Sequence, residues 1–211
     1  MADPAVADTV ILRYFLFVHR SDLLLELLGR PVYTPRIVFD PEEGLPAREE
    51  AMSEVTRSIL VQRRTAADPG RSRRDREEAQ RKADGLEEIR ALHSSGVVEV
   101  VDLSDEELVS FARLTSSKGA RELGLTFRLH PGEAACVAIA VNRGWVLATD
   151  DQDALKALEH LSPGHAYQRI RRLLRQGAES GVLPRENANA IHTEMTGLGF
   201  RDDELPFPEV N

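Results

Sequence analysis

The sequence predicts an α/β fold with a mainly parallel central sheet, and two observations support this fold class. Short apolar runs that are typical of strands alternate along the chain with longer stretches that have helical start and stop signals. One of these runs, residues 145–148, is apolar throughout, as a strand buried inside a parallel sheet would be. The 211 residues are enough for one large domain with a buried core, and no internal repeat divides the chain.

The amino-terminal part contains two predicted strands and two predicted helices. Residues 5–12 begin as a strand and residues 13–18 continue as a buried helix; periodicity does not place the switch, and Asp8 lies close to it. Ser21 and Asp22 cap a second helix, over residues 23–28, which Gly29 ends. Residues 32–39 form the next strand, and Pro35 restricts that strand to an edge of the sheet or to a break.

A helical insertion is predicted over about residues 45–95, after an acidic loop rich in proline and glycine. Residues 47–64 have the pattern of an amphipathic helix. Residues 73–93 form a strongly charged helix with an apolar stripe at Leu86, Ile89 and Leu92. Because a second breaker-rich loop joins the two helices, they are expected to form a hairpin that projects from the main fold.

The carboxyl-terminal part continues the alternation. Residues 97–103 form a strand, and Ser104 opens a helix with a capping-box pattern. Residues 116–125 are polar, contain two glycines and are interpreted as a loop. A helix apolar on every side then runs from Pro131 to Val141, and Gly144 stops it before the strand at 145–148. Helices follow over residues 155–161, 167–179 and 185–197, the last two as a two-helix extension over about residues 165–200.

Composition restricts the class of protein. The net charge of -8 argues against general polyanion binding, because a uniformly acidic surface repels phosphate. Arg169, Arg172 and Arg175 have helical spacing and either contact nucleic-acid phosphates or belong to a solvated face, since Arg171 spreads the charge around the helix. The single Cys136 is expected to be inert core. The absence of a signal-peptide pattern and of a long apolar stretch favours a cytoplasmic protein with no membrane partner.

Acidic residues recur where predicted strands end and predicted helices begin, namely Asp8, Asp40, Glu54, Glu133, Asp150, Asp151 and Asp153. Helix-dipole complementation or an ordinary loop position explains each of them singly. In one cleft, however, carboxylates repel one another unless a divalent cation offsets their charge. Oxygen-only ligands favour Mg²⁺ or Mn²⁺, and a water bound to such a cation can attack a phosphodiester. The pattern therefore predicts metal-assisted phosphodiester hydrolysis.

Three segments resemble the acidic motifs of PIN-domain nucleases, the class that includes VapC-type toxins. They are Asp8-Thr9, the helix start Gly132-Glu133-Ala134, and residues 147–154, which read LATDDQDA. The resemblance covers residues 5–43 and 97–161, and the two-helix end is similar to that of a PIN subgroup of nucleic-acid-binding proteins. It implies a single PIN-like domain over residues 1–211 in which a three-layer sandwich has helices on both faces of the sheet.

The resemblance also implies which acids act. The expected catalytic residues are Asp8, Glu54, Glu133 and Asp151, and the expected ligands of Mg²⁺ or Mn²⁺ are Asp8, Glu133, Asp150, Asp151, Asp153 and Asp40. Asp40 and Glu54 are alternatives for one position, and Glu54 is preferred because it lies on a helix after a hydroxyl residue. The chain departs from the family at Val10, where Asn or Ser commonly stands, which removes a polar group that would orient Asp8.

A nuclease of this class implies RNA, or another single-stranded nucleic acid, as the substrate. If the chain is the toxin of a toxin-antitoxin pair, it also implies an antitoxin protein as a partner, and homodimers are common in the family. The alternative is a catalytically weak or inactive PIN fold that binds RNA or a protein partner, with the helical insertion as its interaction module. Val10 and the acidic net charge support that alternative.

Overall fold

The computed structural model describes residues 3–42, 52–202 and 204–208, which form an α/β fold around one parallel sheet. The sheet has five strands in the order β3-β2-β1-β4-β5, and every neighbouring pair is parallel. The strands are β1 (Ala5–Ala7), β2 (Val32–Pro35), β3 (Val98–Val101), β4 (Val146–Ala148) and β5 (Tyr167–Gln168). The predicted fold class and the parallel sheet are confirmed.

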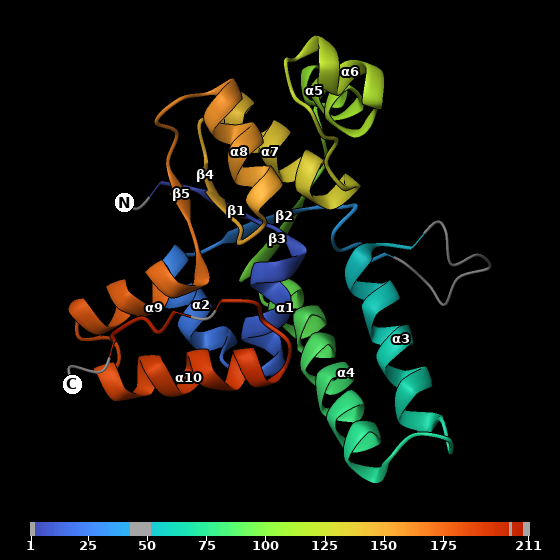
Figure 1. The fold of residues 1–211 in the computed structure, drawn as a ribbon, viewed down its shortest axis with the longest axis vertical. Helices are drawn as coiled ribbons and strands as arrows, with labels where there is room; N and C mark the ends of the chain where they lie inside the picture. The colour runs from blue at the N-terminus through green and yellow to red at the C-terminus, as the bar shows by residue number, and fades with distance from the viewer. Residues whose placement is uncertain (1–2, 43–51, 203, 209–211) are drawn as a thin grey trace.

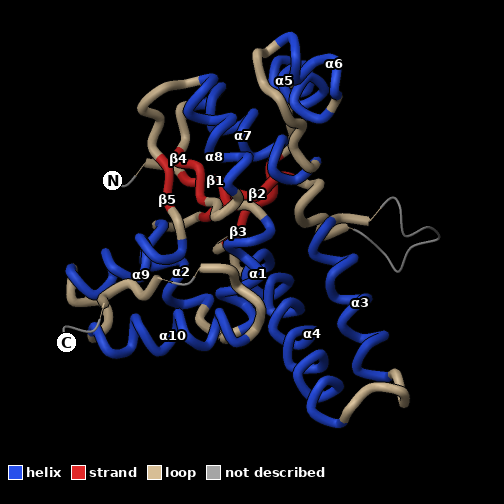
Figure 2. Tube along the Cα trace, viewed as in Figure 1, coloured by secondary structure: helices blue, strands red, loops and turns tan. Residues whose placement is uncertain are grey.

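Helices cover both faces of the sheet (Figure 1). The helices on one side are α7 (Pro131–Arg143), α8 (Gln152–Leu161), α5 (Asp105–Thr115), which packs on α7, and α6 (Ser117–Glu122). Those on the other side are α1 (Thr9–Phe17), α2 (Ser21–Leu28), α9 (Ile170–Glu179) and α10 (Arg185–Gly197). Figure 2 shows the strands as a narrow central layer between them. The arrangement is compatible with a three-layer sandwich.

The switch from β1 to α1 occurs at Asp8. All three residues of β1 are buried, and the side chain of Asp8 then caps α1 by accepting a hydrogen bond from the backbone N–H of Ile11 at 3.0 Å. Ile11 and Phe15 are completely buried on α1, so the apolar run continues into the core after it changes from strand to helix. The strand predicted over residues 5–12 is therefore too long.

The predicted hairpin is present as α3 (Glu54–Ala67) and α4 (Arg73–Ser94), which pack along each other, with α4 also against α1. The first helix begins at Glu54, later than predicted, and residues 43–51 of the predicted insertion lie outside the described part of the chain. The late start has a local cause: the N–H groups of Glu54 and Val55 donate to the carbonyl oxygens of Ile37 and Val38, at 3.0 and 2.9 Å. These bonds satisfy donors that the first turn of a helix leaves free.

Three other elements differ from the sequence predictions. β2 is shorter than the predicted strand over residues 32–39, because it ends at Pro35; the predicted break is therefore confirmed, while the alternative edge position is wrong, since β2 lies between β1 and β3. Residues 117–122 are helical instead of a loop, because the side chain of Ser116 caps the backbone N–H of Gly119 at 3.0 Å. Residues 167–168 form β5, so the helix predicted from residue 167 begins at Ile170.

Helix α7 is the buried centre of the fold. Every residue from 134 to 140 is buried, including Cys136, and the helix ends at Gly144 in the left-handed conformation, as predicted. Helix α10 spans residues 185–197, which are the predicted bounds. In the part of the chain that the structure describes, no helix is both long enough and apolar enough to span a bilayer.

Candidate active site

Four helices begin close together beyond the carboxyl ends of β1 and β4, and each carries an acid at its start. Asp8 is the N-cap of α1, and Asp151 is the N-cap of α8. Glu54 lies in the first turn of α3, and Glu133 lies in the first turn of α7. Parallel strands deliver the following helix starts to one edge of the sheet, so acids far apart in the sequence meet there. The helix dipoles at these starts favour negative charge.

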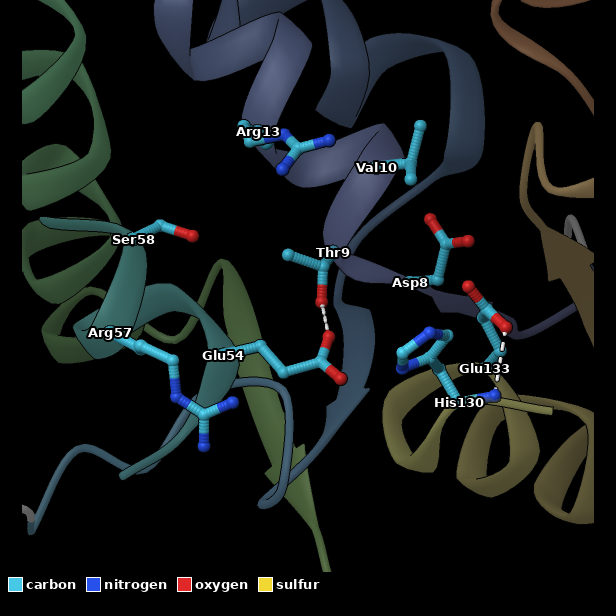
Figure 3. A pocket seen from close by; sticks show the side chains of 9 residues that line it. All are labelled: Asp8, Thr9, Val10, Arg13, Glu54, Arg57, Ser58, His130 and Glu133. Carbon is cyan, nitrogen blue, oxygen red and sulfur yellow. Dashed lines mark hydrogen bonds between the residues drawn. The ribbon is translucent and has the colours of Figure 1, made fainter. Parts of the chain in front are cut away.

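Three of these acids line one cleft of about 280 Å³. Figure 3 shows Glu54 near its centre, with Asp8 and Glu133 on one side and Arg13 and Arg57 on the other. The complete lining is Asp8, Thr9, Val10, Arg13, Glu54, Arg57, Ser58, His130 and Glu133. The cleft therefore has an acidic wall and a basic wall, and the acidic wall is built from three separate elements.

Asp8 is the most perturbed acid of the cleft. The residue is only 1% exposed, and this burial raises the pKa of its carboxyl group from 3.8 to about 7. Hydrogen bonds from the Thr149 hydroxyl and the Ile11 N–H oppose the shift, while the charges of Asp150 and Glu133 add to it. Two hydrogen bonds therefore fix the orientation of the Asp8 carboxyl group, and burial leaves it poorly solvated.

Thr149 provides a polar group that orients Asp8. Its hydroxyl donates to Oδ2 of Asp8 and accepts the backbone N–H of Asp151 at 3.1 Å, so it joins two of the four acids. Thr149 is completely buried at the end of β4, whereas Val10 is partly buried in the cleft wall. The sequence had placed Thr149 in the acidic motif without giving it a role.

Glu54 is held by two other elements. The Thr9 hydroxyl of α1 donates to Oε2, and the backbone N–H of Gly132 on α7 donates to Oε1 at 3.0 Å. A Cβ atom at position 132 would lie 2.5 Å from Oε2 of Glu54, so this approach requires glycine. Asp40, the alternative to Glu54, bonds to Arg36 at 2.9 Å and to the N–H of Glu42, and does not line the cleft. The geometry favours Glu54.

Glu133 and Asp151 influence each other. Burial raises the pKa of the Glu133 carboxyl group, and the negative charges of Asp151 and Glu54 add to the increase. Glu133 also accepts the backbone N–H of His130 at 3.1 Å in a capping box. Oδ1 of Asp151 accepts the N–H of Ala154 at 2.8 Å. Both carboxylates thus cap the N-terminus of a helix and lie close to other negative charges.

Comparisons of the chain with family models, with curated proteins and with solved structures found no match. The cleft itself is therefore the basis for assigning a function.

The donor set suits a hard divalent cation, because the acids of the cleft and Asp151 offer only carboxylate oxygens. Each oxygen that accepts one hydrogen bond keeps capacity for a second partner. Within residues 3–42, 52–202 and 204–208, however, no group of three or more His, Cys, Asp or Glu side chains has an arrangement that could hold a metal ion. The type of ligand atom therefore suits Mg²⁺ or Mn²⁺. The side chains that carry these atoms are, however, spread around the cleft wall.

The other predicted ligands point to different partners. Asp150 accepts the N–H of Ile170 at 2.7 Å and Nε of Arg169 at 2.9 Å, so it closes the start of α9. Asp153 is half exposed and pairs with Lys156 at 2.9 Å. The structure therefore places Asp8, Glu54 and Glu133 around one cleft, with Asp151 linked to Asp8 through Thr149, and leaves Asp150, Asp153 and Asp40 with structural contacts.

The arginines predicted on α9 have mixed surroundings. Arg169 is committed to Asp150, and Nε of Arg175 donates to the carbonyl oxygen of Pro206 at 3.0 Å. Arg172 is exposed and donates to the carbonyl oxygen of Tyr167 at 3.4 Å. Two of the three side chains therefore hold the fold together, in contrast to a free phosphate-binding face.

Sequence reasoning missed the basic wall. Arg13 lies on α1 next to a buried tyrosine, and Arg57 lies one turn after Glu54 on α3. Nε of Arg13 is buried without a hydrogen-bond partner, and Nη2 of Arg57 donates to the carbonyl oxygen of Met52 at 3.3 Å. Arg57 could have been predicted from its spacing, because it follows the predicted acid Glu54 by three residues and residues three apart share a helix face.

Proposed function

We propose that the chain is a Mg²⁺- or Mn²⁺-dependent endoribonuclease of the PIN type. The observation that supports this best is the convergence of four acids from four helix starts, Asp8, Glu54, Glu133 and Asp151. Helix dipoles account for each acid singly but not for their meeting at one place. Burial raises the pKa values of Asp8 and Glu133, the charges of neighbouring acids add to the increase, and a bound cation would offset both effects.

The residues divide into three roles under this proposal. Asp8, Glu133 and Asp151, completed by Glu54, would hold the cation, which supplies an activated water and neutralises charge on the leaving oxygen. Thr149 and Thr9 keep Asp8 and Glu54 oriented through their hydroxyl groups.

On the opposite wall, Arg13 and Arg57 would bind the phosphate that is cleaved. Guanidinium groups suit phosphate because they donate two parallel hydrogen bonds. Both arginines line the same cleft as the acids, so a phosphate held by them would lie beside the proposed cation site (Figure 3).

The test is cleavage of a labelled single-stranded RNA with Mg²⁺, with Mn²⁺ and with EDTA. Cleavage should require the metal, and Asp8→Asn should reduce it by about a hundredfold or more, because it removes a ligand worth several kcal/mol. Asp84→Asn is the matched control, since Asp84 is an exposed acid on α4. Equal cleavage by Asp8→Asn and the wild type, or full cleavage in EDTA, would refute the proposal.

A non-catalytic RNA-binding protein is the second candidate function. The spread of the described carboxylates around the cleft wall favours it, because no three of them are arranged to hold a metal ion. RNA binding in EDTA without cleavage under any metal condition would select this candidate. The antitoxin partner and the homodimer stay predictions, which co-purification and analytical ultracentrifugation can check.

A further inference from the structure

We infer that a single RNA strand reaches the cleft across the loop that joins α6 to α7, held there by Arg121 and Arg128. This inference rests on the proposed function, because it names the path by which the substrate enters the same site. In Figure 1 the joining segment descends from α6 toward the level of the sheet, where α7 begins. The path is defined by three hollows that adjoin one another.

Shared lining residues show that the three hollows are neighbours. The first, of about 440 Å³, lies beside α6 and includes Arg128 in its lining. The second, of about 290 Å³, is lined by Arg128 and also by His130. His130 in turn lines the acidic cleft of about 280 Å³. The three hollows therefore follow one another along the chain from α6 to the acids, with Arg128 and His130 at their borders.

The charge of this path suits a polyanion. Arg121 and Arg128 are exposed in the first hollow, and no acidic residue of the described chain lines the first or the second hollow. Arg128 has no ion pair or side-chain hydrogen bond with any described residue. The whole chain has a net charge of -8, so two arginines without an acid in the lining form a locally favourable place for phosphates. Arginine is also the side chain that can donate two parallel hydrogen bonds to one phosphate.

An aromatic ring makes a single strand the better occupant. Phe127 lines the first hollow between the two arginines and is partly buried, so its ring is held in place. Nζ of Lys156 lies 5.7 Å from the centre of that ring. Single-strand binders combine phosphate contacts with aromatic rings on which bases stack. An acidic peptide would use the arginines but would gain nothing from stacking on Phe127.

Binding should be measured without cleavage, by fluorescence anisotropy of a labelled single-stranded RNA of about ten nucleotides in EDTA. We expect Arg121→Ala/Arg128→Ala to weaken binding by about tenfold or more and to reduce the slope of log affinity against log salt by about 1.4, at 0.7 for each lost phosphate contact. Phe127→Leu should weaken binding without changing the salt slope. Arg90→Ala, an exposed arginine on α4, is the matched control.

The length of the RNA separates this path from a general effect on folding. A trinucleotide that fills only the acidic cleft should bind the double variant as well as the wild type, while the longer RNA should not. The affinity for single-stranded DNA of the same sequence shows whether the path binds deoxyribose as well as ribose strands. Unchanged binding of the long RNA by the double variant, or an equal loss in Arg90→Ala, overturns the inference. Path-dependent binding without any cleavage would instead refute the nuclease proposal and leave the path in place.

Discussion

Replacing Asp8 with asparagine should change how the stability of the protein depends on pH. Burial raises the pKa of the Asp8 carboxyl group from 3.8 to about 7. Between these two values the unfolded chain has already released the proton, while the folded chain still holds it. A rise in pH through this window therefore favours the unfolded state and lowers the free energy of unfolding of the wild type. Above the folded pKa the loss is complete.

The size of the effect follows from the shift. At ~1.4 kcal/mol for each pKa unit, the whole loss is about 4 kcal/mol, and about 3 kcal/mol of it falls between pH 5 and pH 8. The Asp8→Asn variant cannot ionise at this position and keeps a carbonyl oxygen that can accept the N–H of Ile11. Its free energy of unfolding should therefore rise relative to the wild type by about 3 kcal/mol over that range.

Urea unfolding followed by circular dichroism, in EDTA and at several pH values from about 5 to about 8, measures this difference. Taking the difference between the two proteins removes most of the contribution of the other acids. Asp84→Asn should run parallel to the wild type, because Asp84 is exposed. A difference between Asp8→Asn and the wild type that changes by less than about 1 kcal/mol would contradict the reasoning.

Three further changes test the packing. Arg143→Met should lower the free energy of unfolding by about 3–5 kcal/mol in urea, because it leaves the Glu107 carboxylate, 2% exposed, without its paired guanidinium. Gly85→Ala should destabilise by at least about 1 kcal/mol and lower Tm, because its methyl group would meet the carbonyl oxygen of Leu16. Iodoacetamide should label Cys136 only after unfolding, because burial raises the pKa of its thiol; rapid labelling of the native protein would contradict this.

The fold class was predictable because it depends on local patterns, while two errors arose from contacts that those patterns do not contain. The proline rule considers the missing N–H of Pro35 but not that the strand ends there. The two glycines at residues 117–125 suggested a loop, yet Gly119 lies inside α6. A Cβ atom at that position would lie 2.5 Å from Cα of Arg113, so the glycine permits a helix to pack closely on α5.

The order of the acids along the chain predicted which motifs contribute to the cleft region. It did not predict which of two adjacent acids in one motif does so. Asp150 and Asp151 are adjacent in the sequence, and only the position of α9 decides that Asp150 turns to Arg169 while Asp151 caps α8. The meeting of the two arginines in one cleft could not be predicted for a related reason. Arg13 and Arg57 come from helices that are distant in sequence, and their shared cleft depends on how α3 is placed beside α1.

That placement changes the meaning of the helical insertion. The hairpin was predicted to project from the main fold, and only the alternative hypothesis made it an interaction module, yet its first helix supplies both Glu54 and Arg57 to the cleft. The Thr9 hydroxyl and the Gly132 N–H hold Glu54 between α1 and α7, so any ligand that shifted α3 away from α1 would remove an acid and an arginine from the cleft together. If the proposed nuclease activity is present, a partner bound to the hairpin would therefore change it through the position of Glu54.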